Sequence, residues 1–380
     1  MNTPRLLFVI NDAAYFLSHR LAIALAAQEA GFEIHVATPD SMETANVRAH
    51  GFSYHPLPLT RSSANPFSEI STICTLIRLF RYIKPDLLHL VTIKPVIYGG
   101  IAARLSGGAA IVAAVPGLGF VFSQRGFKAN VIRFLVGRLY RIALGGNRLR
   151  AIFQNPDDAG RIARLAALSA EQICLIRGAG VDLTTYAASP LPEEIPLVVL
   201  AARMLKDKGV VEFVEAARLL RQSGCNARFA LVGEPDPGNP ASLMKADIAQ
   251  WLAEGTVEYF GYRSDIPEIL KASSLVVLPS YHEGMPKVLL EAQACGRAVI
   301  TTDVPGCRDA ITPGVTGLLV PPRDAPALAG AINTLLDDRD RLQTMGKAGR
   351  ALAEKAFDVR YVVAQHMEIY RSLTSKDSVI

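Results

Sequence analysis

The segment LVVLPSYHEGMPKVLLEA, residues 275–292, carries the strand, loop and helix that decide the fold class. Its β-branched apolar run Leu275–Pro279 is typical of a short strand, and Pro286 suits the first turn of a helix that we expect to run over Pro286–Ala294. Gly284, in the loop between them, lets the backbone approach a ligand closely. A strand that passes into a helix in this way is the repeating unit of an α/β fold with a parallel sheet.

The same alternation of short apolar runs and longer helical stretches recurs along the chain. In the first half the pattern predicts strands at Leu6–Ile10, Glu33–Thr38, Asp86–Thr92, Ala109–Ala114 and Ala151–Gln154, and helices at Ser18–Ala30 and Ser68–Ile83. In the second half it predicts further strands at Leu197–Ala201, Arg228–Val232, Val257–Phe260 and Ala298–Thr302, and helices at Val210–Gln222 and Ser242–Ala253. We therefore expect an α/β protein with two doubly wound, Rossmann-like domains that face a central cleft, with the ligand at the carboxyl ends of both sheets.

A Pro-rich polar stretch, Ser189–Pro196, separates the two series of strands and is typical of an interdomain linker. It sets the predicted boundaries, with an N-terminal domain over residues 1–188 and a C-terminal domain over residues 189–360. For residues 361–380 we expect a C-terminal helix that crosses back to the N-terminal domain.

The composition of the 380 residues is that of a folded protein, because 50% are apolar and 20% are charged, and this excludes disordered and low-complexity classes. The five cysteines are spread without a close pair, so we expect neither a disulfide scaffold nor a CxxC zinc site, and a reducing compartment fits best. The first apolar run, Leu6–Ile10, is too short for a signal peptide, and no apolar stretch reaches the length of a membrane span. We expect a cytoplasmic protein.

The positive charge is concentrated in the first half of the chain. The net charge of +5 is the balance of +8 over residues 1–190 and −3 over the rest, and residues 87–156 hold nine basic residues and no acidic one. A field of one sign implies a polyanionic partner, which could be nucleic acid, a phosphorylated substrate or anionic lipid. Nucleic acid is the weakest of these, since the sequence has no recognisable nucleic-acid-binding motif.

Two carboxylates and two cations are the candidate site residues of the second half. The free N–H groups at the helix start near Pro286 would hold a diphosphate, and the carboxylate of Glu291 can accept the two vicinal hydroxyls of a ribose. Arg203 and Lys208 follow the first strand of this half, at the carboxyl edge of its sheet, where two cations can neutralise a pyrophosphate leaving group. The alternative is an ordinary turn with a capping Glu and solvated loop cations.

These residues resemble the family 4 retaining glycosyltransferases of GT-B fold, through Glu283-x7-Glu291 with Gly284-Met285-Pro286, preceded by Arg203-x4-Lys208-Gly209. The resemblance covers nearly the whole chain. Four further stretches are similar to bacterial members that add a sugar to a polyprenyl-diphosphate-linked acceptor: Phe16–Arg20, Thr92–Pro95, Pro116–Phe120 and Pro305–Arg308.

The resemblance implies that Arg203 and Lys208 grip the donor diphosphate, Glu291 the ribose, and Glu283 the transferred sugar. It implies retention of anomeric configuration, a UDP-linked donor by analogy, no further cofactor and no divalent metal. The candidate catalytic residues are Glu283, Lys208, Arg203 and His19. His19 lies at the start of the first predicted helix, and the alternative for it is a polar residue near the helix cap. The implied donor-binding residues are Arg203, Lys208, Tyr262, Arg263, Glu283, Gly284, Met285, Pro286, Lys287, Val288 and Glu291.

The acceptor side of the enzyme is expected in the basic first half, through Lys94, Arg125 and Lys128. Residues 124–149 carry arginines and lysines interleaved with apolar residues at helical spacing, a pattern that favours a basic amphipathic helix on an anionic membrane surface. Such a helix would place the protein at the cytoplasmic face of the inner membrane, in surface-polysaccharide or glycan biosynthesis. The alternative is a helix that packs its apolar stripe on the sheet.

The sequence departs from the family at two points. Asn11–Tyr15 replaces a glycine-rich turn, and Val115–Gly119 contains no His where many relatives have one. Two other functions remain open. A nucleotide-sugar 2-epimerase of the same fold would need carboxylates and histidines in both domains. A non-catalytic sugar-binding protein would have no use for the pair Arg203 and Lys208 on a neutral sugar.

Overall fold

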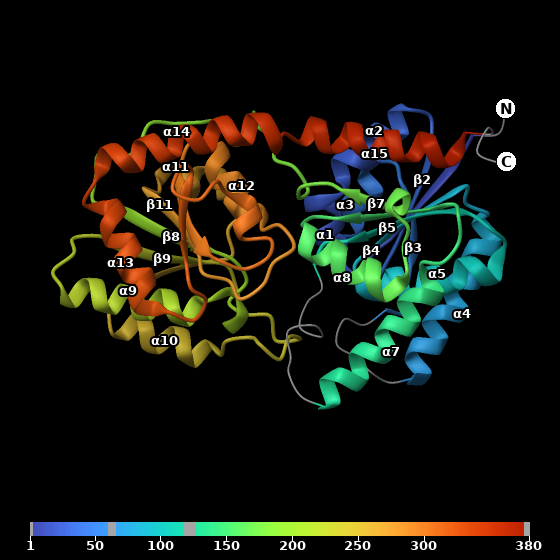
Figure 1. The fold of residues 1–380 in the computed structure, drawn as a ribbon, viewed down its shortest axis with the longest axis horizontal. Helices are drawn as coiled ribbons and strands as arrows, with labels where there is room; N and C mark the ends of the chain where they lie inside the picture. Colours follow the sequence, from blue (N-terminus) through green and yellow to red (C-terminus); the bar gives the residue numbers. More distant parts are fainter. Residues whose placement is uncertain (1–2, 60–65, 118–126, 376–380) are drawn as a thin grey trace. The chain divides into compact units, whose positions relative to one another are not determined.

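The computed structural model describes residues 3–59, 66–117 and 127–375 (Figure 1). The chain forms two compact units: Met1–Ala179 with Arg360–Ile380 makes unit 1, and Gly180–Val359 makes unit 2. The first boundary therefore lies earlier than the predicted 188/189. The reason is that Val181 N donates to Phe357 O at 2.8 Å and Val359 N donates to Val181 O at 3.0 Å, which joins the two ends of unit 2.

Unit 1 is built on a parallel seven-stranded sheet in the order β3-β2-β1-β4-β5-β6-β7. The strands are β1 (Arg5–Val9), β2 (Glu33–Thr38), β3 (Ser53–Pro56), β4 (Leu87–Val91), β5 (Ala110–Val115), β6 (Leu149–Phe153) and β7 (Ile173–Leu175). All residues of β4 and β5 are buried, as expected for inner strands of a parallel sheet that is covered on both faces. The strand order reverses between β1 and β4, so unit 1 is doubly wound as predicted.

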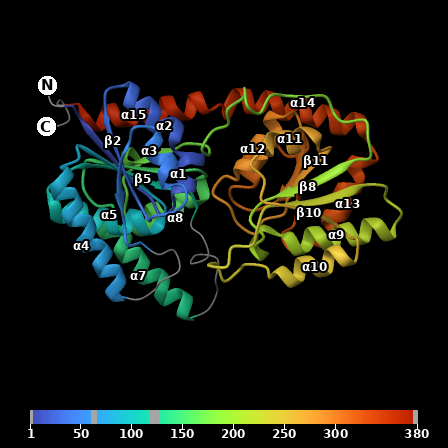
Figure 2. The ribbon, with the colours of Figure 1, turned by 180° about the vertical axis from the view of Figure 1, so that it is seen from behind.

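Helices cover both faces of the unit 1 sheet, and α4, α5 and α7 lie side by side on one of them (Figure 2). This face is packed by α4 (Pro66–Ile83), α5 (Ile93–Ser106), α7 (Phe127–Ala143) and α8 (Pro156–Ala166). The other face is packed by α1 (Ala13–His19), α2 (Leu21–Glu29), α3 (Thr44–Ala49) and α15 (Val359–Thr374), while the 3₁₀ turn η1 (Ala170–Gln172) precedes β7.

The first helix differs from the prediction that Ser18 caps a single helix through Ala30. The side chain of Asp12 accepts from Tyr15 N at 3.1 Å and caps α1, so the helix begins at Ala13. It ends at His19, because Arg20 leaves the helical region before α2 begins at Leu21. His19 therefore lies in the last turn of a helix rather than at the start of one.

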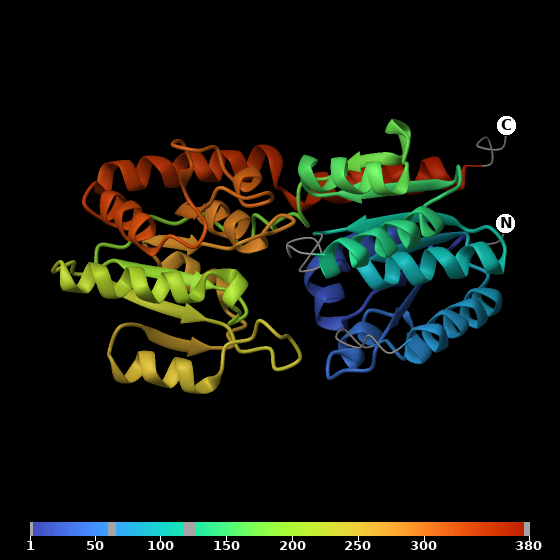
Figure 3. The same cartoon turned by 60° about the horizontal axis from the view of Figure 1, so that its bottom comes forward.

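Unit 2 has a parallel six-stranded sheet in the order β10-β9-β8-β11-β12-β13 (Figure 3). Its strands are β8 (Leu197–Ala201), β9 (Arg228–Val232), β10 (Glu258–Gly261), β11 (Leu275–Leu278), β12 (Ala298–Thr302) and β13 (Gly317–Val320). The order reverses between β8 and β11, which makes this the switch point of the sheet. A ligand of a doubly wound fold binds at such a point, beyond the carboxyl ends of the strands.

Two sets of helices cover the unit 2 sheet. One face is packed by α9 (Val210–Gln222), α10 (Lys245–Ala253) and α13 (Ala325–Leu336). The other face is packed by α11 (Ile266–Ala272), α12 (Lys287–Ala294) and α14 (Arg339–Ala356), and η2 (Lys206–Lys208) and η3 (Arg308–Ala310) are 3₁₀ turns.

Two helices of unit 2 begin later than the sequence predicts. The helix expected from Ser242 begins at Lys245, since Ser242 is held in an antiparallel bridge with Leu205. The helix expected from Pro286 begins at Lys287, with Pro286 as its N-cap residue. Over the described ranges, none of the helices combines the length and the apolar character that crossing a membrane requires.

Candidate functional site

The turn after β8 carries the two predicted cations and is tied to the neighbouring loops. Lys206 N donates to Ala241 O at 2.8 Å, and Tyr281 N donates to Asp207 O at 2.9 Å. Gly209 ends the turn with a φ of +72°, and a Cβ built there would lie 2.1 Å from Pro279 O. Glycine is therefore required at 209, both by the left-handed backbone and by the close approach to the end of β11.

Lys208 and Glu283 meet at the switch point of the unit 2 sheet. Lys208 Nζ donates to Glu283 Oε1 at 2.5 Å, and Ser280 Oγ donates to the same oxygen at 2.7 Å. Only 18% of the lysine side chain and 13% of the glutamate side chain are exposed. This burial strengthens the attraction between the two charges, and it leaves them able to act on a ligand at the strand ends.

The loop that presents Glu283 is braced by the segment after β12. Thr302 Oγ1 donates to Ser280 O, and Glu283 N donates to Pro305 O at 3.3 Å. Gly306, at φ +80°, approaches so closely that an added Cβ would lie 2.3 Å from Glu283 O. Burial, followed by the charge of Glu283, raises the pKa of the Cys307 thiol to about 12, which makes it an inert part of this packing.

Glu291 lies on α12 and is almost fully buried. Its Oε1 lies 3.0 Å from Lys287 Nζ, one helical turn earlier. Burial and then the nearby Glu291 carboxylate raise the pKa of the Tyr186 hydroxyl, so Tyr186 stays a hydrogen-bond donor at neutral pH. The neighbouring Met285 packs its side chain into the core of unit 2, and Val288 packs against that core. Only the backbone of Met285 is thus available to a ligand.

Two of the other predicted donor residues form ion pairs of their own. Arg203 is half exposed, and its Nη1 lies 2.6 Å from Asp236 Oδ2. Arg263 forms an ion pair with Asp265 in its own turn, at 2.5 Å, and Tyr262 beside it is 73% exposed after β10. The roles of Arg203, Tyr262 and Arg263 in donor binding stay predictions.

Two of the residues predicted in unit 1, His19 and Lys94, have partners within that unit. The His19 ring stacks on Tyr15 with centroids 4.0 Å apart, and its Nδ1 shares a hydrogen bond of 2.8 Å with Ser18 Oγ. Lys94, in the first turn of α5, lies 2.8 Å from Glu69 Oε1 of α4. Arg125 lies outside the described residues, as does the side chain of Lys128. The roles of all four stay predictions.

Sequence reasoning missed a second set of polar contacts around the site. Tyr281 donates its hydroxyl hydrogen to Glu212 Oε1 at 2.5 Å, and the Arg323 guanidinium lies 4.5 Å from the centre of the Tyr281 ring. Burial and the hydrogen bond to Glu212 raise the pKa of Tyr281. Ser280 directly follows a predicted strand end, which is a signal that could have singled it out. Asp236 carries no comparable signal.

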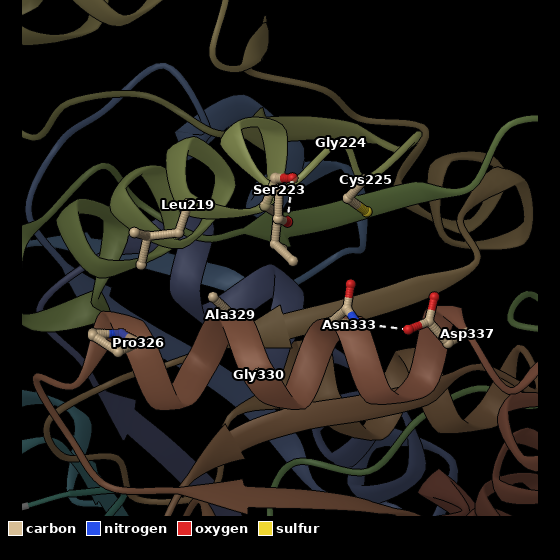
Figure 4. Close-up of a pocket in the computed structure, with 10 residues that line it drawn as sticks. Leu219, Ser223, Gly224, Cys225, Pro326, Ala329, Gly330, Asn333 and Asp337 are labelled. Carbon is tan, nitrogen blue, oxygen red and sulfur yellow. Dashed lines mark hydrogen bonds between the residues drawn. The ribbon is translucent and has the colours of Figure 1, made fainter.

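A separate groove lies between α9 and α13, with a volume of about 570 Å³ (Figure 4). Leu219, Cys225 and Ala329 line it together with Asn333 and Asp337, which hydrogen-bond to each other at 2.6 Å. The groove is at the end of α9, whereas Lys208 precedes its start. A helix of this length spans about 20 Å, so the groove is not part of the candidate site.

Comparison with known families and proteins identifies the chain. Residues 184–352 match the family described as "Glycosyl transferases group 1", and residues 5–153 match "Glycosyl transferase 4-like". A Campylobacter jejuni protein is 31% identical over 96% of this chain and 98% of its own length. Its name is N,N'-diacetylbacillosaminyl-diphospho-undecaprenol alpha-1,3-N-acetylgalactosaminyltransferase. The chain belongs to the glycosyltransferase family that is described as "Glycosyl transferases group 1".

Other similar proteins agree with this assignment. An Escherichia coli protein is 27% identical to this chain, over 80% of this chain and 79% of the Escherichia coli protein. Its name is UDP-Gal:alpha-D-GlcNAc-diphosphoundecaprenol alpha-1,3-galactosyltransferase. Two solved structures share the fold. Anabaena HepE in complex with UDP has a TM-score of 0.77 at 21% identity, covering 97% of this chain and all of its own. A sucrose-phosphate synthase from Thermosynechococcus elongatus has a TM-score of 0.81 at 22% identity, covering 97% and 99%.

The predicted GT-B fold and glycosyltransferase activity are thus confirmed. The relatives described above carry the names of glycosyltransferases, so neither a nucleotide-sugar 2-epimerase nor a non-catalytic binding protein is favoured.

Proposed function

We propose that the glycosyltransferase moves a hexose or N-acetylhexosamine from a UDP-linked donor to a polyprenyl-diphosphate-linked sugar acceptor, with retention of anomeric configuration. The observation that carries this proposal is the partly buried pair of Lys208 and Glu283 at the switch point of unit 2. It places a cation for a diphosphate beside a carboxylate for sugar hydroxyls. The names of the Campylobacter and Escherichia relatives, which act on undecaprenyl-diphosphate-linked sugars, support the acceptor class.

In the proposed reaction, the bond between the anomeric carbon and the donor's β-phosphate oxygen breaks. The acceptor hydroxyl oxygen forms a bond with the same carbon on the same face, and its proton passes to an oxygen of the leaving diphosphate. Lys208 and the first N–H groups of α12 stabilise the charge that develops on the leaving group. Glu283 accepts hydrogen bonds from the sugar hydroxyls and so fixes the anomeric carbon in place.

A panel of nucleotide sugars tests this function directly. The protein is incubated with each of them, with and without a lipid extract of bacterial membranes, and release of nucleoside diphosphate is followed. Release that requires the lipid supports the proposal. Interconversion of the sugar in the absence of lipid would instead identify an epimerase.

The cations of the protein are proposed to replace a divalent metal at the donor diphosphate. Lys208 and Arg203 supply two positive charges at the strand ends, and α12 adds the partial charge of its N-terminus. We therefore expect an excess of EDTA to leave the initial rate of donor turnover unchanged, with added Mg²⁺ as the comparison. A loss of rate that Mg²⁺ restores would contradict metal independence.

Helix α7 is proposed to bind the anionic cytoplasmic face of the membrane. Its apolar side chains Phe134, Leu135, Leu139 and Ile142 are 38–60% exposed, although packing on the sheet would have buried them. The helix packs on the sheet through Tyr140 and Ala143 instead. Exposed arginines stand beside the apolar residues, and the Arg138 guanidinium lies 5.1 Å from the centre of the Phe134 ring. An apolar face flanked by cations complements an anionic lipid surface.

Replacing Phe134 by Asp is expected to weaken binding to vesicles of equal parts phosphatidylglycerol and phosphatidylcholine by about tenfold or more, since burying a Phe side chain contributes about 1.5–3 kcal/mol. The bound fraction is measured by co-sedimentation. The matched control is Leu252→Asp on α10 of unit 2, where the leucine is 42% exposed. Equal binding by both variants would refute the role of α7.

A further inference from the structure

The guanidinium of Arg203 has an acidic partner at the site proposed for the donor diphosphate. Its Nη1 lies 2.6 Å from Asp236 Oδ2, with 50% of the Arg203 side chain and 23% of the Asp236 side chain exposed. Any diphosphate that binds this guanidinium must therefore compete with a carboxylate that already accepts its hydrogen bond. The contact takes up one of the guanidinium's donors and places a negative charge beside it, and both effects weaken its attraction for a diphosphate.

The segment that carries Asp236 is built against the segment that carries Arg203. Met204 N donates to Glu234 O at 2.9 Å, Leu243 N donates to Met204 O at 2.9 Å, and Leu205 pairs with Ser242 in an antiparallel bridge. We call residues 234–243 the Asp236 arm. Lys206 N also donates to Ala241 O, so three consecutive residues after Arg203 are tied to the arm, which therefore fixes the aspartate opposite the arginine.

The arm also holds Asp236 itself in position. Asp236 N donates to Ser242 Oγ at 3.0 Å, and Asn239 N donates to Asp236 O at 2.8 Å. The backbone of Asp236 is thus fixed at both its N–H and its carbonyl. The half-exposed arginine, by contrast, has room to turn its guanidinium away from the carboxylate. A competing anion would therefore displace the arginine side chain and leave the arm in place.

The pair differs in kind from the one between Lys208 and Glu283. Glu283 has a proposed role of its own at the sugar hydroxyls, and it keeps a hydrogen bond from Ser280 when Lys208 turns to a phosphate. Asp236 has no such part in the proposed reaction. Its contact with Arg203 lowers the fraction of protein molecules in which the arginine is available to a diphosphate. The apparent dissociation constant of the diphosphate rises as this fraction falls.

We propose that Asp236 is a competing anion that weakens the binding of nucleoside diphosphates through Arg203, and so favours release of the diphosphate product after transfer. This inference rests on the proposed function, since it takes Arg203 to be a ligand of the donor diphosphate. Asp236 acts through Arg203 and is a positioning residue rather than a catalytic one.

Calorimetric titration with UDP, and with GDP in parallel, tests the inference. Replacing Asp236 by Asn is expected to tighten UDP binding by about two- to fivefold, the effect of removing one half-exposed ion pair. Structural damage would weaken UDP binding, so a gain in UDP affinity distinguishes the loss of a competing anion from damage to the fold. The matched control is Glu258→Gln, which removes the partner of Arg228 in a similarly exposed pair at 2.7 Å, at the opposite end of β9. It should leave the affinity unchanged.

A double substitution shows whether the gain passes through Arg203. Arg203→Met and Arg203→Met with Asp236→Asn are expected to bind UDP equally. Unchanged or weaker binding by the Asp236→Asn variant, or a gain that persists in the double variant, would overturn this inference while leaving the proposed function intact. If the wild-type protein binds neither UDP nor GDP, the proposed donor site fails and the inference fails with it.

Discussion

Replacing Lys208 by Met is expected to lower the rate of sugar transfer by a factor of about 10²–10³, the usual cost of losing one preorganised donor at a developing negative charge. Lys208 Nζ lies at the switch point of unit 2, only 18% exposed, where its charge is poorly screened by water. Met keeps most of the length of the side chain and removes the charge. Initial rates at saturating donor and acceptor measure the effect.

The control for this substitution lies in the same turn. Lys206 is exposed, two residues before Lys208, and Lys206→Met should leave the transfer rate close to that of the wild type. Thermal unfolding of both variants shows whether the fold is kept, because removing one partner of a partly buried pair leaves Glu283 without its cation. If the Lys208→Met variant is folded and transfers sugar normally, the site assignment is wrong.

The partner substitution, Glu283→Gln, separates donor binding from turnover. The amide keeps the volume of the carboxylate but loses its charge, so Lys208 no longer has a competing anion nearby. We expect UDP to bind as tightly as before, or more tightly, while the transfer rate falls by a similar factor. The reason is that the neutral amide offers the sugar hydroxyls one weaker acceptor oxygen in place of a charged carboxylate. A large loss of UDP affinity with unchanged turnover would contradict the role given to Glu283.

Local sequence patterns predicted the framework of the site well. The uncharged run Leu275–Pro279, with its two valines, predicts a short strand, and β11 lies there. Pro286 marks a helix start by its fixed φ, and α12 follows it directly. Lys208 lies between the predicted strand Leu197–Ala201 and the helix predicted from Val210, and Glu283 lies in the loop between the strand Leu275–Pro279 and Pro286, so both are loop residues at the carboxyl ends of strands.

Contacts between distant segments were out of reach of the same reasoning. Asp236 pairs with Arg203 across 33 positions, and Glu69 pairs with Lys94 across 25, with no periodic pattern to connect them. The break at Arg20 was also missed, because the apolar spacing runs on through it and only the capping by Asp12 sets the helix start. Tertiary hydrogen bonds decided these features, and a local pattern does not contain them.

Replacing Gly209 by Ala is expected to impair the enzyme far more than the same change at Gly224. Both glycines have left-handed backbones, with φ of +72° and +80°. An added Cβ meets nothing within 4 Å at Gly224, but at Gly209 it would lie 2.1 Å from Pro279 O. The cost of the left-handed conformation, about 1–2 kcal/mol, is thus common to both. Only the Gly209 variant must also shift the backbone at Pro279, which destabilises the fold by about 1–3 kcal/mol more.

The backbone shift that the Gly209→Ala substitution requires would change the geometry of the candidate site. Gly209 follows Lys208 directly, and Pro279 directly precedes Ser280, so the clash pushes apart the two loops that bring Lys208 and Glu283 together. A shift of about 1 Å at reacting groups can cost a factor of about 10² in rate. Urea unfolding of both variants gives the stability difference, and transfer kinetics give the rate. Equal losses in the two variants would show that backbone conformation alone requires glycine at 209, and that the approach to β11 does not hold the charged pair in place.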